Sequence, residues 1–268
     1  MIPTVQELYE LWAGESELQD DLQRSLGPRG ADWLFELFAS LGPRPGQLVV
    51  DVGARDARHA IRLVREHRLR AVALDPLPLH DTLAREAIAA AGLAGEIDVV
   101  EAAVESMPLA DASADWIWCR DVLVHADARR GLAECARILR PEGSMLAYVT
   151  LATERLEPRE AAELVRSLAL SAESLEAERL EAAAIEAGLV LRSVERLGSE
   201  WRERMLETEE WNAAHDLLRL ARLRRREDAL VERYGPEAVA AATGGLLWGI
   251  YQLLGKLCPT VYVWQRDG

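Results

Sequence analysis

The chain has 268 residues, half of them hydrophobic and 28% charged, a composition that supports a globular core without disulfides. Its formal net charge of −14 argues against a nucleic-acid substrate, because proteins that bind polyanions usually present a basic surface. The one dense basic run, residues 222–226, follows an apolar-periodic stretch, so a solvated helix face is favoured over a phosphate or partner patch.

Cysteine usage and the first residues bear on the compartment. The three cysteines have no paired or metal-ligand spacing, and His67, His80 and His215 have no carboxylate or cysteine partner at ligand spacing. Residues 1–4 lack the basic and apolar segments of a signal peptide, and no apolar stretch reaches membrane-spanning length. We therefore expect a cytoplasmic protein with reduced thiols, no metal, and neither nucleic acid nor membrane as a partner.

The first part of the chain is predicted to be helical. Apolar side chains recur at helical spacing over residues 4–41, with turn signals at Gly27-Pro28 and Gly42-Pro43. We predict an N-terminal helical cap over residues 1–45.

After the cap, short apolar runs alternate with amphipathic segments. Residues 48–52 are rich in β-branched side chains, which is typical of a buried parallel strand. This alternation predicts an α/β fold with a Rossmann-like, doubly wound, mostly parallel sheet. Strands are predicted at 71–74, 97–100, 116–119 and 144–149, and helices after residue 58 and at 79–92 and 128–139.

The pattern loosens beyond residue 150. Helices are predicted at 158–170 and 173–187, a sixth strand at 189–197 and a last strand at 261–264. The intervening stretch is helix-rich and contains tryptophan. We predict a core over 46–200, a helical insertion over 201–258 that packs over the functional edge of the sheet as a lid, and a final core strand within 259–268.

The loop after the first strand and the end of the second strand are the candidate ligand site. In an open α/β sheet, ligands bind in the crevice outside the carboxyl ends of such strands. Asp75 ends the second strand about twenty residues beyond Gly53, a position from which a carboxylate accepts hydrogen bonds from ribose hydroxyls. The pair predicts a cofactor that contains adenosine.

Four segments in this order resemble the motifs of small-molecule, class I S-adenosylmethionine (SAM)-dependent methyltransferases: residues 51–53, 73–76, 105–115 and 137–143. The resemblance covers roughly residues 45–150 and implies the methyltransferase fold with SAM as cofactor. It implies that the methionine part lies over residues 53–57, the ribose on Asp75 and the adenine near residues 103–105. The implied cofactor-binding residues are Asp51, Gly53, Arg55, Asp75, Pro76, Glu105 and Cys119.

The chain departs from the family pattern at three positions. Arg55 and Ala57 stand where the family usually has its second and third loop glycines, and Ala103 stands where an adenine-binding Asp is common. Glycine permits unusual backbone angles and close ligand approach. The replacements therefore favour either an altered loop or an arginine that contacts a cofactor or substrate carboxylate.

Asp121 and His125 follow the fourth strand, where the family presents catalytic or substrate-orienting groups. Asp121 is a candidate to position an amine or accept a hydroxyl proton, and His125 is a candidate general base. Alternatively, Asp121 caps the following helix and His125 packs beside the cofactor. Methyl transfer that depends only on alignment needs no base.

Tryptophan is frequent, with eight residues against two phenylalanines. Aromatic rings that line a pocket suit an apolar or cationic small molecule, whereas packing between helices explains the same residues equally well. The candidate substrate pocket consists of Trp12, Trp118, Trp201, Trp248 and Tyr251.

The leading hypothesis is methyl transfer from SAM to a small-molecule acceptor in specialised metabolism. The first alternative keeps the fold for SAM-independent chemistry, such as intramolecular substitution, elimination or closure of an aziridine-type ring with sulfate as leaving group. The second is a non-catalytic, methyltransferase-like subunit of a partner. A homodimer or a small protein partner is compatible with each.

Overall fold

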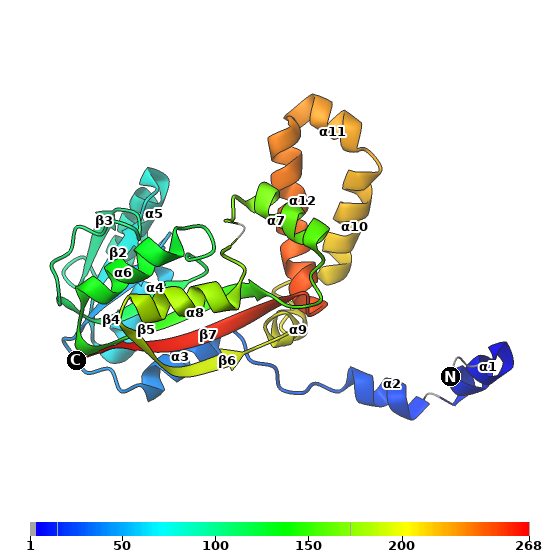
Figure 1. Cartoon of the computed structure of the whole chain (residues 1–268), viewed down its shortest axis with the longest axis horizontal. Helices are drawn as coiled ribbons and strands as arrows, with labels where there is room; N and C mark the ends of the chain where they lie inside the picture. Colours follow the sequence, from blue (N-terminus) through cyan, green and yellow to red (C-terminus); the bar gives the residue numbers. More distant parts are fainter. Residues whose placement is uncertain (1–3, 15, 172, 268) are drawn as a thin grey trace.

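The structure is a computed structural model that describes residues 4–14, 16–171 and 173–267; residues 1–3, 15, 172 and 268, which fall in the predicted cap, core and final strand, lie outside the described residues. Figure 1 shows a sheet flanked by helices, with a helical arm at one end. The strands are β1 (Leu48–Val52), β2 (Arg70–Asp75), β3 (Ile97–Glu101), β4 (Ala114–Arg120), β5 (Leu139–Ala152), β6 (Leu189–Arg196) and β7 (Leu257–Arg266). The helices are α1 (Val5–Ala13), α2 (Ser16–Gln23), α3 (Ala31–Ser40), α4 (Arg58–His67), α5 (Pro78–Ala91), α6 (Ala128–Ile138), α7 (Pro158–Leu168), α8 (Ala177–Glu186), α9 (Glu200–Glu207), α10 (Ala213–Arg224), α11 (Glu227–Tyr234) and α12 (Pro236–Leu253).

The strands form one sheet in the order β3-β2-β1-β4-β5-β7-β6. All pairs from β3 to β5 are parallel, whereas β7 is antiparallel to both β5 and β6. The prediction of a doubly wound, mostly parallel sheet is confirmed. In this register Val52 pairs with Leu74 on one side and Cys119 on the other, so the carboxyl ends of β1, β2 and β4 meet at one edge.

Helices cover both faces of the sheet. Successive strand residues point to opposite sides, so the apolar side chains on each face need a layer of helices to bury them. Val49 packs into the cluster formed with α3, α4 and α5, while Val50 and Val52 pack into the cluster formed with α6 and α8. All three valines are at most 1% exposed, which explains the continuous apolar run of β1.

The predicted N-terminal cap consists of two different parts. Helix α3 packs on the sheet, with Leu34 and Phe38 at most 1% exposed. Helices α1 and α2 instead stand away from the core in Figure 1, and apolar residues such as Tyr9 and Leu22 remain exposed. In this arrangement α1 and α2 cover no part of the sheet.

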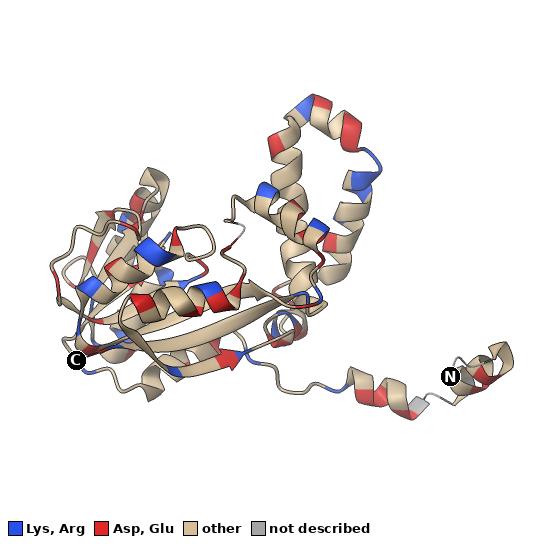
Figure 2. Cartoon of the chain, in the orientation of Figure 1, with Lys and Arg blue, Asp and Glu red and all other residues tan. Residues whose placement is uncertain are grey.

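The predicted insertion is an arm beside the sheet edge rather than a cover over it. Helices α10, α11 and α12 rise with α7 from the end of the sheet where β5 and β7 pair (Figure 1). Helix α9 and the last turns of α12 pack against the core. The basic run 222–226 is mostly exposed at the end of α10 and in the turn to α11, next to acidic residues of α11, as Figure 2 shows. In the described part of the chain, every helix is too short or too polar to span a bilayer.

Candidate functional site

The loop between β1 and α4 keeps a backbone shape that glycine normally provides. Gly53, Arg55 and Ala57 have φ angles of 75°, 50° and 55°, although only the first is glycine. Left-handed backbone costs a non-glycine residue about 1–2 kcal/mol, so the surroundings must hold the loop. A Cβ atom on Gly53 would lie 2.2 Å from Cγ2 of Val122. Arg55 and Ala57 therefore adopt the left-handed backbone that glycine would adopt without strain.

Asp51 supports the loop from beneath. It is 1% exposed, and its Oδ2 accepts a hydrogen bond of 3.0 Å from the backbone N–H of Ala60 in the first turn of α4. Burial raises the pKa of Asp51 to about 7. Cys119 is also fully buried, and burial raises the pKa of its thiol. Both residues lie under the floor of the site, which differs from the direct cofactor contacts expected of them.

Asp75 is held at the end of β2 by three protein donors. Its Oδ2 accepts from the backbone N–H of Arg55 at 3.0 Å, and its Oδ1 accepts from that of Leu77 at 3.1 Å. Nδ1 of His80 lies 2.8 Å from Oδ1, and this nitrogen carries the proton because a carboxylate only accepts. Oδ2 retains the capacity to accept one further donor.

A cavity of about 420 Å³ opens where β1, β2 and β4 end. This volume is in the range of small-molecule sites, about 300–1,000 Å³. Six predicted site residues line it: Gly53, Arg55, Asp75, Pro76, Asp121 and His125. The wall also contains Ala54, Asp56, Arg58, His59, Leu77, His80, Arg120 and Val122.

The two catalytic candidates lie on this wall in different settings. Oδ1 of Asp121 accepts hydrogen bonds from the backbone N–H and hydroxyl of Thr150, at 3.1 and 3.0 Å. Burial raises the pKa of Asp121. Helix α6 is capped by Asp127, so the alternative that Asp121 caps it is wrong. His125 is exposed at the cavity rim.

A second cavity, of about 670 Å³, lies between α3, α4 and α9. It shares Arg58, His59 and Arg120 with the first cavity. Trp201, one of the predicted pocket residues, lies on its wall, and its ring is 5.1 Å from the guanidinium carbon of Arg120. The two cavities therefore meet at the end of β4.

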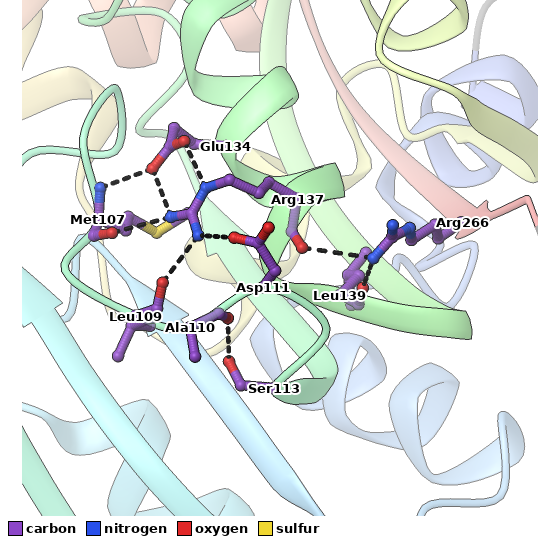
Figure 3. A network of polar contacts seen from close by, with 9 residues as sticks. All are labelled: Met107, Leu109, Ala110, Asp111, Ser113, Glu134, Arg137, Leu139 and Arg266. Atoms are coloured by element: carbon purple, nitrogen blue, oxygen red, sulfur yellow. Dashed lines mark hydrogen bonds and ion pairs between the residues drawn. The ribbon is translucent and has the colours of Figure 1, made fainter.

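Two of the motifs in the sequence are structural partners of each other. Arg137 of α6 donates to the backbone oxygens of Met107 and Leu109 and to the carboxylates of Asp111 and Glu134, at 2.7–2.9 Å (Figure 3). The guanidinium of Arg137 lowers the pKa of Glu134. This network fixes the loop between β3 and β4 against α6, at the side of the site.

Glu105 lies in the same loop but outside the cavity. Its Oε1 accepts a hydrogen bond of 2.9 Å from the backbone N–H of Asp127, just before α6. Neither Glu105 nor Ala103 lines the cavity beside Asp75. The carboxylate of Glu105 therefore orders the segment that carries His125, and the predicted adenine contact has no support in this arrangement.

The remaining aromatic candidates are dispersed. Trp12 is 55% exposed on α1, away from the core. Trp118 is fully buried and packs against Phe35 and Phe38, because it points from β4 into the sheet face that α3 covers. Trp248 packs half-buried in the arm, and Tyr251 lines a separate cavity of about 760 Å³ between α7, α10 and α12. Only Trp201 joins the site.

Sequence reasoning missed His59, His80 and Arg120 as site residues. Arg120 is the last residue of β4, so the rule that placed Asp121 at the carboxyl edge could have placed it there too. The role of His80 carried no signal, since its contact with Asp75 arises from the first turn of α5.

Comparison with known proteins gives a family match over the segment from β1 to β5. Residues 50–147 match the family described as "Methyltransferase domain". The core of this chain resembles this family and has the fold of class I SAM-dependent methyltransferases. The domain is 31% identical over 155 residues to dimethylglycine N-methyltransferase of Parasynechococcus marenigrum (strain WH8102), a match that covers 55% of each protein. The chain thus spans about half the length of the curated relatives it matches.

Solved structures resemble the chain over more of its length. A protein of Galdieria sulphuraria assigned as a sarcosine dimethylglycine methyltransferase has a TM-score of 0.69 and 24% identity, covering 88% of this chain and 84% of that one. The [4+2]-cyclase SpnF has a TM-score of 0.68 and 20% identity, covering 100% of this chain and 97% of that one. At these identities the likeness shows the fold alone.

SAM is the cofactor of this family, and the residues of the methyltransferase domain fit it. Gly53 lines the cavity with its backbone in the left-handed region, and Oδ2 of Asp75 can accept a ribose hydroxyl. The cavity between them has an appropriate volume. Within the described residues, no cluster of three or more His, Cys, Asp or Glu is arranged to hold a metal ion.

Proposed function

We propose that this chain is a SAM-dependent methyltransferase that acts on a small-molecule acceptor. The observation that carries the proposal is the loop of residues 53–57, which keeps three left-handed residues beside the carboxylate of Asp75. A loop that had lost the cofactor would be free to relax to ordinary backbone angles. The retained strain is therefore best explained by a ligand that needs this shape.

In this proposal each wall residue has a defined task. Bound SAM supplies an electrophilic methyl group on its sulfonium. The loop at Gly53 would hold the methionine part and Asp75 the ribose, with His80 fixing the carboxylate of Asp75. The raised pKa of Asp121 suits a group that takes a proton from the acceptor. His125, at the rim of the cavity, would orient the acceptor.

The relatives support a small acceptor but leave its nucleophilic atom open. One matched relative is named for N-methylation of dimethylglycine and another, from Aspergillus sclerotiorum, as an O-methyltransferase. A cytoplasmic location and a place in specialised metabolism stay predictions from the sequence.

Calorimetric titration of the full chain with SAM and S-adenosylhomocysteine tests the proposal. We expect micromolar binding by the unchanged protein. Asp75→Asn should weaken it roughly tenfold to a hundredfold, the cost of one hydrogen bond to a charged group. Asp98→Asn, an exposed carboxylate on β3, is the matched control and should bind as the unchanged protein does.

Absence of binding in a folded protein would overturn the proposal. SAM-independent substitution, elimination or ring closure, or a non-catalytic partner role, would then be the hypotheses to pursue. Equal affinities of the Asp75 and Asp98 variants would instead remove the ribose assignment.

A further inference from the structure

Arg120 stands out among the arginines around the second cavity. Arg29, Arg58 and Arg62 each form an ion pair with at least one carboxylate. Arg204 forms none within the described residues, but it is exposed, so water compensates its charge. Arg120 is half-buried, and in the described part of the chain it too lacks an ion pair.

Among the described residues, the Arg120 side chain has one hydrogen-bond contact, and its partner is a neutral group. Nη1 of Arg120 lies 3.2 Å from Nε2 of His59. Burial, followed by the charges of Arg120 and Arg58, lowers the pKa of His59 to about 4, so the ring is uncharged near neutral pH. An arginine only donates, so Nε2 accepts and Nδ1 carries the proton. This contact orients the guanidinium without neutralising it.

The acidic residue that follows Arg120 in the chain, Asp121, is already engaged elsewhere. Its Oδ1 accepts two hydrogen bonds from Thr150. The attraction between Asp121 and Arg120 is weaker than the effect of burial, which raises the pKa of Asp121. Asp121 therefore compensates the guanidinium charge only in part.

Aromatic rings restrict the direction from which an anion can approach. The guanidinium carbon of Arg120 lies 5.1 Å from the ring of Trp201 and 5.6 Å from that of Tyr148. Such rings stabilise the cation over its face and leave the N–H groups at its edge, apart from the Nη1 donor to His59, available to a ligand. A carboxylate matches this edge because a guanidinium donates two parallel hydrogen bonds to it.

We propose that Arg120 binds the carboxylate of an acidic acceptor that occupies the second cavity. This inference rests on the proposed function and specifies its substrate class: a small organic acid whose nucleophilic nitrogen or oxygen lies a few bonds from the carboxylate. A sulfonium in the first cavity and the guanidinium at the junction repel each other. A carboxylate held by Arg120 would offset this repulsion and would fix the acceptor where the two cavities meet.

Matched pairs of acids and alcohols test the proposal on the full chain saturated with S-adenosylhomocysteine. The probes are dimethylglycine against dimethylaminoethanol and salicylate against salicyl alcohol, titrated to tens of millimolar. We expect at least one acid to bind roughly tenfold or more tightly than its alcohol. Arg120→Gln should abolish this preference, and Arg120→Lys should retain part of it.

Three measurements separate this role from a structural one. The melting temperature of Arg120→Gln reports folding, and its affinity for S-adenosylhomocysteine should stay within about threefold of the unchanged protein. Arg65→Gln removes an arginine of α4 that bonds to the backbone oxygen of Ala91, outside both cavities, and should keep the acid preference.

The proposal is overturned if neither acid binds better than its alcohol, or if neither acid binds at all. It is also overturned if Arg120→Gln weakens S-adenosylhomocysteine tenfold or more while methylthioadenosine, which lacks the amino-acid carboxylate, binds unchanged. Arg120 would then hold the cofactor's own carboxylate. Failure of the proposed function is a different result, since the unchanged protein would not bind S-adenosylhomocysteine.

Discussion

The loop after β1 and helix α12 of the arm both depend on glycine, but for different reasons. Gly53 has a left-handed backbone, and an added Cβ would meet Val122. Gly244 has ordinary helical backbone, and its smallness lets α12 approach Ser167 and Leu168 of α7. The loop requires a conformation, which non-glycine residues also adopt at two of its positions, whereas the arm requires space. Glycine count alone is therefore a poor guide to whether the cofactor loop is intact.

The largest effect is expected from Gly53→Ala. The left-handed backbone and a Cβ 2.2 Å from Cγ2 of Val122 should together cost about 2–5 kcal/mol of unfolding free energy or move the loop. Affinity for S-adenosylhomocysteine should fall at least a hundredfold, about 2.7 kcal/mol. Calorimetry measures the affinity and thermal unfolding measures the stability. If neither changes, the loop is not part of the binding site.

The second prediction concerns the support beneath the loop. Folding raises the pKa of Asp51 from 3.8 to about 7, so the folded state binds its proton more tightly than the unfolded state does. The resulting stabilisation is complete below pH 4, is lost as the pH rises towards 7 and stays absent above it. Asp51→Asn should remove this pH dependence. Relative to the unchanged protein, the variant should therefore gain up to about 4 kcal/mol of unfolding free energy between pH 4 and pH 8, at 1.36 kcal/mol per pKa unit.

Urea unfolding of both proteins between pH 4 and pH 8 measures the difference in unfolding free energy. Taking the difference between variant and unchanged protein cancels the contribution of Asp121, whose pKa is also raised by burial. Parallel curves for the two proteins would contradict the prediction for Asp51.

In the arm, Gly244→Ala should lower the free energy of unfolding and leave cofactor binding unchanged. The added Cβ would lie 2.6 Å from Cβ of Ser167, and overpacking of this kind costs about 1–3 kcal/mol. Gly245→Ala, where nothing lies within 4 Å, is the control and should stabilise the helix by up to about 1 kcal/mol. Affinity for S-adenosylhomocysteine should be the same in both variants, and a loss in either would couple the arm to the site.

The smallest effect is expected from Arg55→Gly. Arg55 is exposed and has φ 50°, so glycine should relieve about 0.5–1 kcal/mol of strain in the folded state. Chemical unfolding should show this gain. A loss of stability would mean that the side chain holds the loop, and a loss of cofactor affinity alone would show that it contacts the ligand.

The fold was more predictable than the site because strands and the site depend on different information. The apolar runs of β1 and β4 and the acid at the end of β2 follow from local sequence, and the register then brings Gly53, Asp75 and Asp121 to one cavity. The His59–Arg120 contact joins residues 61 positions apart, and the His80–Asp75 contact depends on how α5 begins after β2; one chain carries no signal for either. Trp118 was misplaced because the strand-end rule does not say which face a side chain enters.

The position of β7 has a consequence for how this protein is made. The strand nearest the C-terminus, Leu257–Arg266, lies between β5 and β6 and pairs with both. During synthesis β6 therefore has no place in the sheet, and β5 exposes an unpaired edge, until the final strand has emerged. Domains fold from the N-terminus as they are made, so here the sheet is completed only after residue 266 has emerged. Until then its open edge is the part of the chain most exposed to mispairing and to chaperones.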